Sequence, residues 1–136
     1  MEKMTSDSFF NGRIRIHQDQ SGYRYSIDAV LLAYYARPQP GERVLDLGTG
    51  CGIIPLIMAF RCSDIRIYAV EIQKELSDLA TFNVRENNMH KRITVLCEDM
   101  KALKSSMIAG LVDLEVVPYS SGYMGIKRNI PVTFAF

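Results

Sequence analysis

Hydrophobic and polar positions along the chain follow two periodicities, one typical of buried strands and one typical of helices. Short apolar runs rich in β-branched residues predict strands, and they cover residues 43–47, 65–70 and 93–97. Apolar residues at helical spacing predict helices, and these cover residues 27–36, 53–60 and 74–88. Strands that alternate with helices predict βαβ units, a parallel sheet and right-handed crossovers.

Two of the predicted helices differ in how they should be buried. The helix at 53–60 is apolar nearly all round and is predicted to be buried, with Pro55 tolerated in its first turn. The helix at 74–88 carries charges on one face and is predicted to be an amphipathic surface helix. Its buried face is predicted to contain Leu76, Leu79, Ala80, Phe82 and Val84.

Composition narrows the class of protein without identifying it. The chain has 136 residues, 48% of them hydrophobic, and 16 Lys+Arg against 15 Asp+Glu give a net charge of +1. This fits one average-sized domain and argues against a protein that coats nucleic acid, although it leaves room for a local basic patch. Three cysteines suggest no disulfide framework, so a cytoplasmic location is expected. No apolar run approaches the roughly 18 to 20 residues that cross a membrane, and no export signal is evident.

A glycine-rich segment lies between the first predicted strand and the next helix. It reads Asp46-Leu47-Gly48-Thr49-Gly50-Cys51-Gly52, at the strand end where open α/β sheets bind ligands. The glycines let the backbone turn tightly and approach a ligand, and free N–H groups of the helix start would favour a negative group. The spacing lacks the third glycine of the dinucleotide fingerprint and the Gly-Lys-Ser/Thr of a P-loop, which disfavours nicotinamide and nucleoside triphosphate ligands.

Acidic residues follow the other two predicted strands. Glu71 ends the second strand, where a carboxylate can accept hydrogen bonds from both ribose hydroxyls of a nucleoside. Asp99 follows the third strand, and Met100 beside it offers an apolar surface for a purine ring. An isolated acid after a strand is more often a helix cap or a solvated loop residue. The joint placement of three acids at one sheet edge favours a nucleoside ligand.

These motifs resemble the cofactor motifs of class I S-adenosylmethionine-dependent methyltransferases. The resemblance implies an α/β, Rossmann-like fold with helices on both faces of the sheet, of which this chain supplies a partial parallel sheet in the order 3-2-1-4 only. It also implies S-adenosyl-L-methionine as cofactor, with Asp46, Gly48 and Gly50 at its methionine part. Glu71 is then expected to bind ribose, and Asp99 the adenine amino group.

The upstream segment resembles a narrower group. Gln18 and the run Ser21 to Ala33 are similar to the N-terminal signature of bacterial tRNA (adenine-N6)-methyltransferases of the tRNA valine type. By this resemblance, which covers about residues 8–113, Gln18 and Arg24 belong to a segment that closes over the cofactor, and tRNA is the expected partner. The alternative for Tyr23, Arg24 and Tyr25 is simple packing of an N-terminal arm.

The resemblance stops at the fourth strand. In these enzymes that strand ends in Asn-Pro-Pro-Tyr, which holds the target amino group and stacks on the flipped base. Here residues 112–119 read Val-Asp-Leu-Glu-Val-Val-Pro-Tyr, and Val117 has no side-chain hydrogen-bond acceptor. We therefore predict no catalytic residue in this chain, and expect a truncated or frame-altered product that is catalytically incomplete. The side of the fourth strand would be left open, which favours self-association through that edge.

These expectations divide the chain into an N-terminal cofactor-closing segment and helix, a cofactor-binding half-domain and an irregular tail, at residues 1–36, 37–117 and 118–136. His17 and His90 are far apart and lack metal-ligand spacing, so no metal is expected. Cys51 is expected to fill space in the glycine loop rather than to act as a nucleophile. The alternatives to a methyltransferase of tRNA are a non-catalytic module that binds the cofactor, a fragment of an rRNA or protein N-methyltransferase, and an inert product.

Overall fold

The computed structural model describes residues 3–22, 24–108, 112–117 and 125–130. The strands are β1 (Met4–Phe9), β2 (Ile14–Asp19), β3 (Arg43–Leu47), β4 (Arg66–Glu71), β5 (Ile93–Cys97), β6 (Val112–Val117) and β7 (Gly125–Ile130). The α-helices are α1 (Ile27–Ala36), α2 (Ile53–Arg61) and α3 (Lys74–Glu86), and two short 3₁₀ turns are η1 (Met100–Ala102) and η2 (Ser105–Met107). Each strand and helix predicted between residues 27 and 97 is confirmed to within two residues at either end.

The main sheet has the strand order β5-β4-β3-β6-β7. The first four strands are parallel, which confirms the predicted order 3-2-1-4. The prediction of only four strands is wrong, because β7 pairs antiparallel with β6 and places Ile126 opposite Val116. Part of the tail that was predicted to be irregular is thus a strand, and it occupies the edge of β6 that was expected to be open. Residues 118–124, which include Pro118 and Tyr119, lie outside the described residues.

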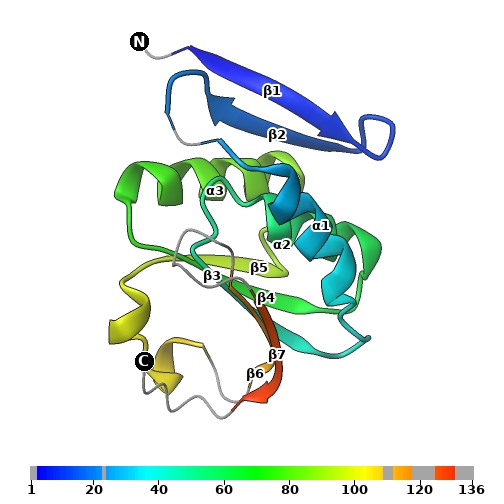
Figure 1. Cartoon of the computed structure of the whole chain (residues 1–136), viewed down its shortest axis with the longest axis vertical. Coiled ribbons are helices and arrows are strands. Elements are labelled where there is room, and N and C mark those ends of the chain that lie inside the picture. Colours follow the sequence, from blue (N-terminus) through cyan, green and yellow to red (C-terminus); the bar gives the residue numbers. More distant parts are fainter. Residues whose placement is uncertain (1–2, 23, 109–111, 118–124, 131–136) are drawn as a thin grey trace.

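The α-helices all lie on one face of the sheet, as Figure 1 shows. In the described residues the other face carries the short 3₁₀ helices η1 and η2 and no α-helix, so the helices predicted for both faces differ strongly in length between the two faces. After β5 the apolar residues Leu103 and Ile108 reach the sheet from short separate turns, because this stretch has no long helical stripe of apolar positions. The helix layer therefore carries most of the packing against the sheet.

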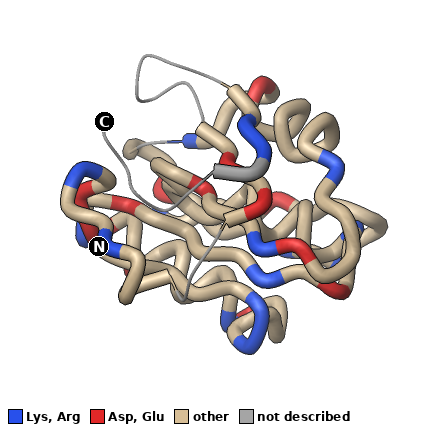
Figure 2. The backbone as a smooth tube through the Cα atoms, turned by 90° about the horizontal axis from the view of Figure 1, so that it is seen from below, with Lys and Arg blue, Asp and Glu red and all other residues tan. Residues whose placement is uncertain are grey.

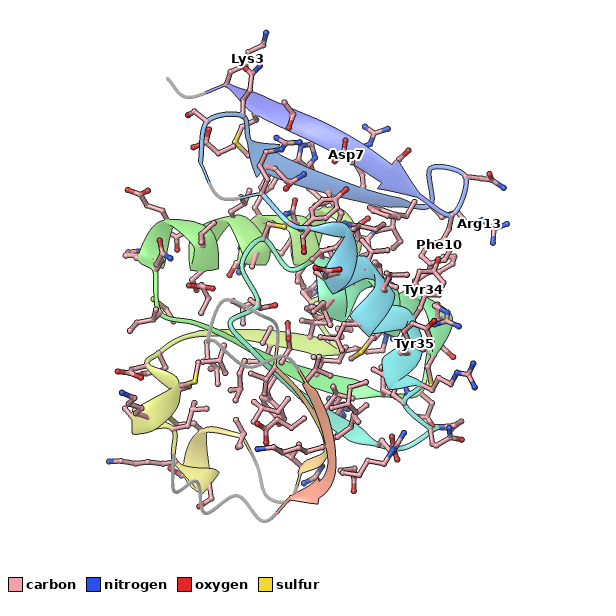
Figure 3. All side chains as sticks on the ribbon, viewed as in Figure 1. Lys3, Asp7, Phe10, Arg13, Tyr34 and Tyr35 are labelled. Carbon is pink, nitrogen blue, oxygen red and sulfur yellow. The ribbon has the colours of Figure 1, made fainter. Side chains whose placement is uncertain are left out.

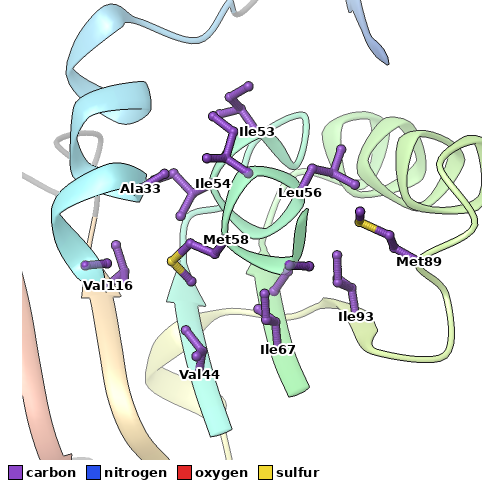
Figure 4. Close-up of a cluster of buried hydrophobic side chains, with 14 of the residues drawn as sticks. Ala33, Val44, Ile53, Ile54, Leu56, Met58, Ile67, Met89, Ile93 and Val116 are labelled. Atoms are coloured by element: carbon purple, nitrogen blue, oxygen red, sulfur yellow. The ribbon is translucent and has the colours of Figure 1, made fainter. Parts of the chain in front are cut away.

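The core on the helix side is built around α2 (Figure 4). Seven of its residues are buried, including Leu56 and Ile57, which confirms the prediction from its nearly continuous apolar sequence. These side chains pack against apolar residues of four parallel strands, among them Val44, Ile67, Ile93 and Val116. On β3 the residues alternate, so that Val44 belongs to this cluster whereas Leu45 and Leu47 belong to the cluster on the other face. Burial on both faces explains why the parallel strands read as continuous apolar runs.

An antiparallel hairpin of β1 and β2, which the sequence pattern did not predict, covers the helices on the side away from the sheet (Figure 1). The side chains of Ile14, Ile16 and Gln18 on β2 are buried. On α3 the predicted burial is wrong at one point, because Phe82 is 46% exposed whereas Asn83 is fully buried. Asn83 faces the hairpin because its side-chain amide bonds to the backbone of β2.

Two asparagine side chains, Asn83 within α3 and Asn87 at its C-cap, bind the backbone edge of β2. The Asn83 amide accepts a hydrogen bond from the His17 N–H (2.9 Å) and donates to the His17 carbonyl (3.0 Å). Asn87, one turn later, makes the same pair of bonds with the N–H (2.9 Å) and carbonyl (2.8 Å) of Arg15. Asn83 also donates to the carbonyl of Cys51 in the glycine loop (2.8 Å). The hairpin is therefore joined to the helix layer and to the loop through one side chain.

Charged residues of both signs are spread over the molecule rather than separated into halves (Figure 2). This distribution fits the net charge of +1. Among the residues that the structure describes, no helix is both long and apolar enough to cross a membrane.

Candidate functional site

A cavity of about 440 Å³ lies at the carboxyl ends of β3, β4 and β5. This is the edge at which open parallel sheets bind ligands, and the volume is that of a small-molecule site. Five of the residues singled out in the sequence line it together: Gly48, Gly50, Glu71, Asp99 and Met100. The sheet brings them together because the three parallel strands end side by side.

The glycine loop turns through left-handed backbone at Gly48 (φ 76°), Gly50 (φ 57°) and Gly52 (φ 90°). These φ values favour glycine, because a Cβ atom would be strained there. Two backbone N–H groups of the loop are already bonded within the chain. Those of Gly48 and Thr49 donate to the Val70 carbonyl at 2.8 and 2.9 Å. These two bonds fix the loop to the end of β4.

Glu71 joins the loop to the second strand. Its side chain is buried, and its two oxygens accept the N–H groups of Gly50 and Gln73, each at 3.0 Å. A carboxylate oxygen has two lone pairs, so each oxygen keeps the capacity for a further hydrogen bond on the cavity side. Glu71 is thus both a structural tie for the loop and an acceptor available to a ligand.

The third strand contributes a mixed polar and apolar wall. Asp99 is exposed and caps η1 by accepting the Lys101 N–H at 2.9 Å, so the capping alternative holds for this residue alongside its place in the cavity wall. Met100 is half-buried and also packs against the apolar cluster on the sheet face opposite the α-helices. The sequence argument missed several lining residues: Val70, Ile72, Gln73, Leu76, Glu98 and Lys101. The sequence carried a signal for one of these residues, because Ile72 is an apolar residue directly after the strand-end acid Glu71. In the structure Ile72 is 62% exposed.

Asp46 lies beneath the glycine loop and does not line the cavity. It is fully buried on the helix side of β3, and neither of its oxygens reaches a hydrogen-bond partner among the described residues. The nearby Thr49 hydroxyl is likewise buried and has no hydrogen-bond partner among the described residues. Burial raises the pKa of Asp46 from 3.8 to about 7; the Thr49 hydroxyl opposes this change and the charge of Glu71 adds to it. The geometry makes Asp46 a buried titratable group under the loop.

Gln18 and Arg24 also lie outside the cavity lining. Gln18 is 1% exposed, and its amide accepts the Tyr25 N–H (2.9 Å) and donates to Asp7 (3.1 Å). Asp7 also accepts the Tyr25 hydroxyl at 2.8 Å. Arg24 donates to the Thr5 hydroxyl at 2.8 Å and lies 3.9 Å from the Asp7 carboxylate. The described contacts of these side chains hold the segment before α1 against the hairpin, which is the packing alternative, while Tyr23 lies outside the described residues.

Cys51 fits a space-filling role in the loop. It is buried, and burial raises the pKa of its thiol to about 12, so the thiol stays neutral at physiological pH. Within the described ranges, no three His, Cys, Asp or Glu side chains are grouped so that they could hold a metal ion.

Comparison with protein families gives one match, over residues 2–106, to the family described as protein-L-isoaspartate(D-aspartate) O-methyltransferase (PCMT). Curated relatives carry the name tRNA1(Val) (adenine(37)-N6)-methyltransferase. The protein from Bacteroides fragilis is 31% identical over 97 residues, which cover 71% of this chain and 40% of the relative. The protein from Phocaeicola vulgatus is 30% identical over 130 residues, which cover 93% of this chain and 55% of the relative. The chain thus spans about half the length of the curated relatives it matches.

Solved structures show the same fold at low sequence identity. P. horikoshii TYW2 in complex with MeSAdo has a TM-score of 0.70 and 21% identity, covering 88% of this chain and 44% of that one. A SAM-dependent methyltransferase from Geobacter sulfurreducens in complex with S-adenosyl-L-homocysteine has a TM-score of 0.59 and 20% identity, covering 72% and 38%. Since the family match spans the hairpin, the glycine loop and the three strand ends at the cavity, the chain belongs to this methyltransferase family and has the Rossmann-like fold of class I S-adenosylmethionine-dependent methyltransferases.

Proposed function

We propose that the chain is the S-adenosylmethionine-binding part of a methyltransferase that acts on the N6 amino group of an adenine in tRNA. The observation that carries the proposal is the cavity at the ends of β3, β4 and β5, where a glycine loop, a carboxylate and an apolar wall meet. The names of the curated relatives support the choice of acceptor. For this chain by itself the proposed function is cofactor binding, and methyl transfer is proposed for the whole protein.

The donor set of the cavity fits a nucleoside with an attached amino-acid chain. Glu71 would accept the two ribose hydroxyls with the lone pairs that its backbone hydrogen bonds leave over. Ile72 and Met100 would pack against the faces or edge of the purine, and Asp99 would accept a hydrogen bond from its amino group. Gly48 and Gly50 place no side chain between the loop and the ligand, which leaves room for the amino-acid chain.

The division of work between cofactor and protein follows from this arrangement. When bound, S-adenosylmethionine supplies a methyl group that its positively charged sulfur has already activated as an electrophile. The residues of this chain orient the ligand, and the rigid tie between Glu71 and Gly50 keeps the ribose acceptor in a fixed relation to the loop. No residue of the chain is assigned to hold the target amino group, because the sequence has no Asn-Pro-Pro-Tyr after Asp113.

The description of the matched family names another acceptor, an isoaspartyl residue of a protein. The matched residues, 2–106, include every residue that lines the cavity. This match therefore supports the cofactor site that both kinds of enzyme need, and it carries no information on the acceptor. We prefer tRNA because the curated relatives carry this acceptor in their names, and the match to the Phocaeicola vulgatus protein extends over 130 residues, more of this chain than the family match at residues 2–106.

Calorimetric titration of the purified chain with S-adenosylhomocysteine tests cofactor binding. Glu71→Gln should weaken binding about 10- to 100-fold, because hydrogen bonds to a charged acceptor are lost. Glu75→Gln removes the same charge from the exposed first turn of α3, outside the cavity, and should leave binding unchanged. Ile72→Ala, which touches no loop hydrogen bond, should weaken binding without altering the fold. A folded chain that shows no saturable binding would overturn the proposal.

The acceptor is tested with a labelled methyl donor. Unmodified tRNA and an isoaspartyl peptide are each incubated with the chain, and the label is measured in both. We expect transfer to neither, together with binding of S-adenosylhomocysteine. Transfer to the peptide would contradict the tRNA assignment, and transfer to adenine N6 would contradict the view that the chain lacks the group that holds the base.

A further inference from the structure

An exposed group of aromatic and arginine side chains lies at the end of the molecule remote from the cavity. It comes from the hairpin turn, the last turn of α1 and the end of α2, and Figure 3 shows four of its members on one side of the molecule. We call it the aromatic–arginine surface, and it consists of Phe10, Arg13, Tyr34, Tyr35, Arg37 and Arg61.

The aromatic rings of this surface are held in place by their neighbours. Phe10 stacks on Phe60 at a centroid distance of 4.2 Å, and lies 6.3 Å from the ring of Tyr34. The guanidinium of Arg61 lies over the Tyr34 ring at 4.3 Å and donates to the Tyr34 carbonyl at 3.1 Å. Tyr35 follows Tyr34 in α1 and is 69% exposed. A tyrosine ring has only two side-chain torsions to order, so it loses little conformational entropy when a flat group stacks on it.

The charges of the surface are of one sign. Arg13, Arg37 and Arg61 are all exposed, and none of them forms a salt bridge with a carboxylate within the described part of the chain. Arg61 uses one guanidinium N–H on the Tyr34 carbonyl, and the guanidinium group has five such donors. Guanidinium groups beside exposed aromatic rings match the two chemical parts of RNA, the phosphates and the faces of the bases.

The position of the surface sets what it can contact. α2 begins at the glycine loop and runs back along the sheet, so its nine residues separate Arg61 from the cavity edge by roughly 14 Å. The surface is therefore too far away to hold the reacting base, and it suits nucleotides that flank the base along the RNA. Resting on the proposed function, we infer that the aromatic–arginine surface binds the RNA substrate outside the reaction site, with Tyr35 stacking on a base and the three arginines contacting phosphates.

An apolar partner is the main competitor for this surface. Ile27 and Leu31 are 68% and 46% exposed on α1. Together with Tyr35 they form a stripe of exposed apolar and aromatic residues at a spacing of four along the helix. A second copy or another protein would use the whole stripe, whereas RNA would use only its arginine-rich end. The unpaired positive charge at that end complements a polyanion and would have to be desolvated against an apolar partner, so it favours RNA.

The test measures the affinity of the full chain for an unmodified, fluorescently labelled tRNA by anisotropy, with S-adenosylhomocysteine present. Tyr35→Ala should weaken binding about 5- to 100-fold, which is the range for loss of one base stack. Phe82→Ala removes an aromatic ring that is 46% exposed on α3, outside this surface; it is the control and should change little. Each of Arg13→Gln and Arg37→Gln should lower the dependence of log affinity on log salt by about one phosphate contact, whereas the same change at exposed Lys104 should not.

The outcomes separate this inference from the proposed function. Wild-type chain that binds S-adenosylhomocysteine but no tRNA, or surface variants that bind tRNA like their controls, would overturn the RNA surface and leave the cofactor site intact. RNA binding that depends on Tyr35 in a chain without cofactor binding would support the surface and overturn the proposed function. A dimer in sedimentation that Tyr35→Ala or Leu31→Ala dissociates, with unchanged tRNA affinity, would overturn the RNA surface and assign the stripe to a second copy.

Discussion

The two layers that enclose the α-helices are attached to them by different forces. On one side the parallel sheet packs against α2 through fully buried aliphatic side chains such as Leu56 and Val44. On the other side the β1–β2 hairpin buries Ile14 and Ile16 and is also bonded through side-chain amides, with Asn83 and Asn87 bound to the backbone of β2. The first attachment is non-directional and spread over many residues, whereas the second adds hydrogen bonds that require a few groups in fixed positions.

This difference bears on the proposed function. The cavity lies at the edge of the sheet, but Asn83 connects the hairpin to the carbonyl of Cys51 within the glycine loop. The hairpin also carries Phe10 and Arg13 of the aromatic–arginine surface. Its attachment is thus the link between the two surfaces for which we propose ligands, and the following changes separate its contribution from that of the core.

Leu56→Ala should have the largest effect on the free energy of unfolding. Leu56 is fully buried in α2, and truncation to alanine leaves a cavity that costs about 2–5 kcal/mol. Urea denaturation followed by circular dichroism measures the loss. Leu31→Ala, the same substitution at a site 46% exposed on α1, should cost less than about 1 kcal/mol. Equal losses at the two sites would contradict the assignment of the core.

Asn83→Ala should destabilise the hairpin more than the sheet. The variant loses bonds to both backbone groups of His17 and to the Cys51 carbonyl, a cost of about 2–3 kcal/mol with partial solvation of the freed groups. Hydrogen exchange should show faster exchange of β2 amides than global unfolding explains. Asn87→Ala provides the graded comparison at a more exposed site and should cost about 1 kcal/mol. Uniform acceleration across β2 and β3 would show that the hairpin does not open separately.

Asp46 should make the stability of the core dependent on pH. Its pKa in the folded chain, about 7, lies above the usual 3.8, so the folded state binds the proton more tightly than the unfolded state between these values. The contribution of this group to the free energy of unfolding is therefore greatest below about pH 4 and falls as the pH rises toward 7. Asp46→Asn removes the titration, and the difference between variant and wild type should grow with pH. A difference that stays constant from pH 4 to 8 would contradict the raised pKa.

Tyr25→Phe should have the smallest effect. The change removes only the hydroxyl that donates to Asp7 at 2.8 Å, and a loss of about 1 kcal/mol is expected. Burial and the Asp7 carboxylate raise the pKa of this phenol, so its absorbance should titrate above that of exposed tyrosines. Tyr35→Phe, at an exposed site, is the control for stability. If both variants match wild type, the contact between Asp7 and Tyr25 does not stabilise the hairpin.

The sequence by itself determined the helices and strands from residue 27 to residue 97 and the order of the four parallel strands. The helices and strands rest on local periodicity, whereas the strand order came from the resemblance of the glycine segment and strand-end acids to class I methyltransferases. The glycine segment and the strand-end acids also followed from sequence, since parallel strands place their carboxyl ends at one edge. Five of the eight predicted site residues indeed line the same cavity.

The tertiary structure alone decided which polar groups face inward and what the chain ends pair with. The burial of Asn83 in place of Phe82 depends on the backbone edge of β2, about 66 residues away in sequence, which no local pattern can indicate. The same holds for Asp46, whose position on the helix face of β3 removes it from the cavity wall. β7 follows β6 closely in sequence, but residues 125–130 read Gly-Ile-Lys-Arg-Asn-Ile and show no clear alternation of apolar and polar positions that predicts a strand. Local periodicity records which residues avoid water, whereas hydrogen-bond partners and strand edges are fixed only when distant segments meet.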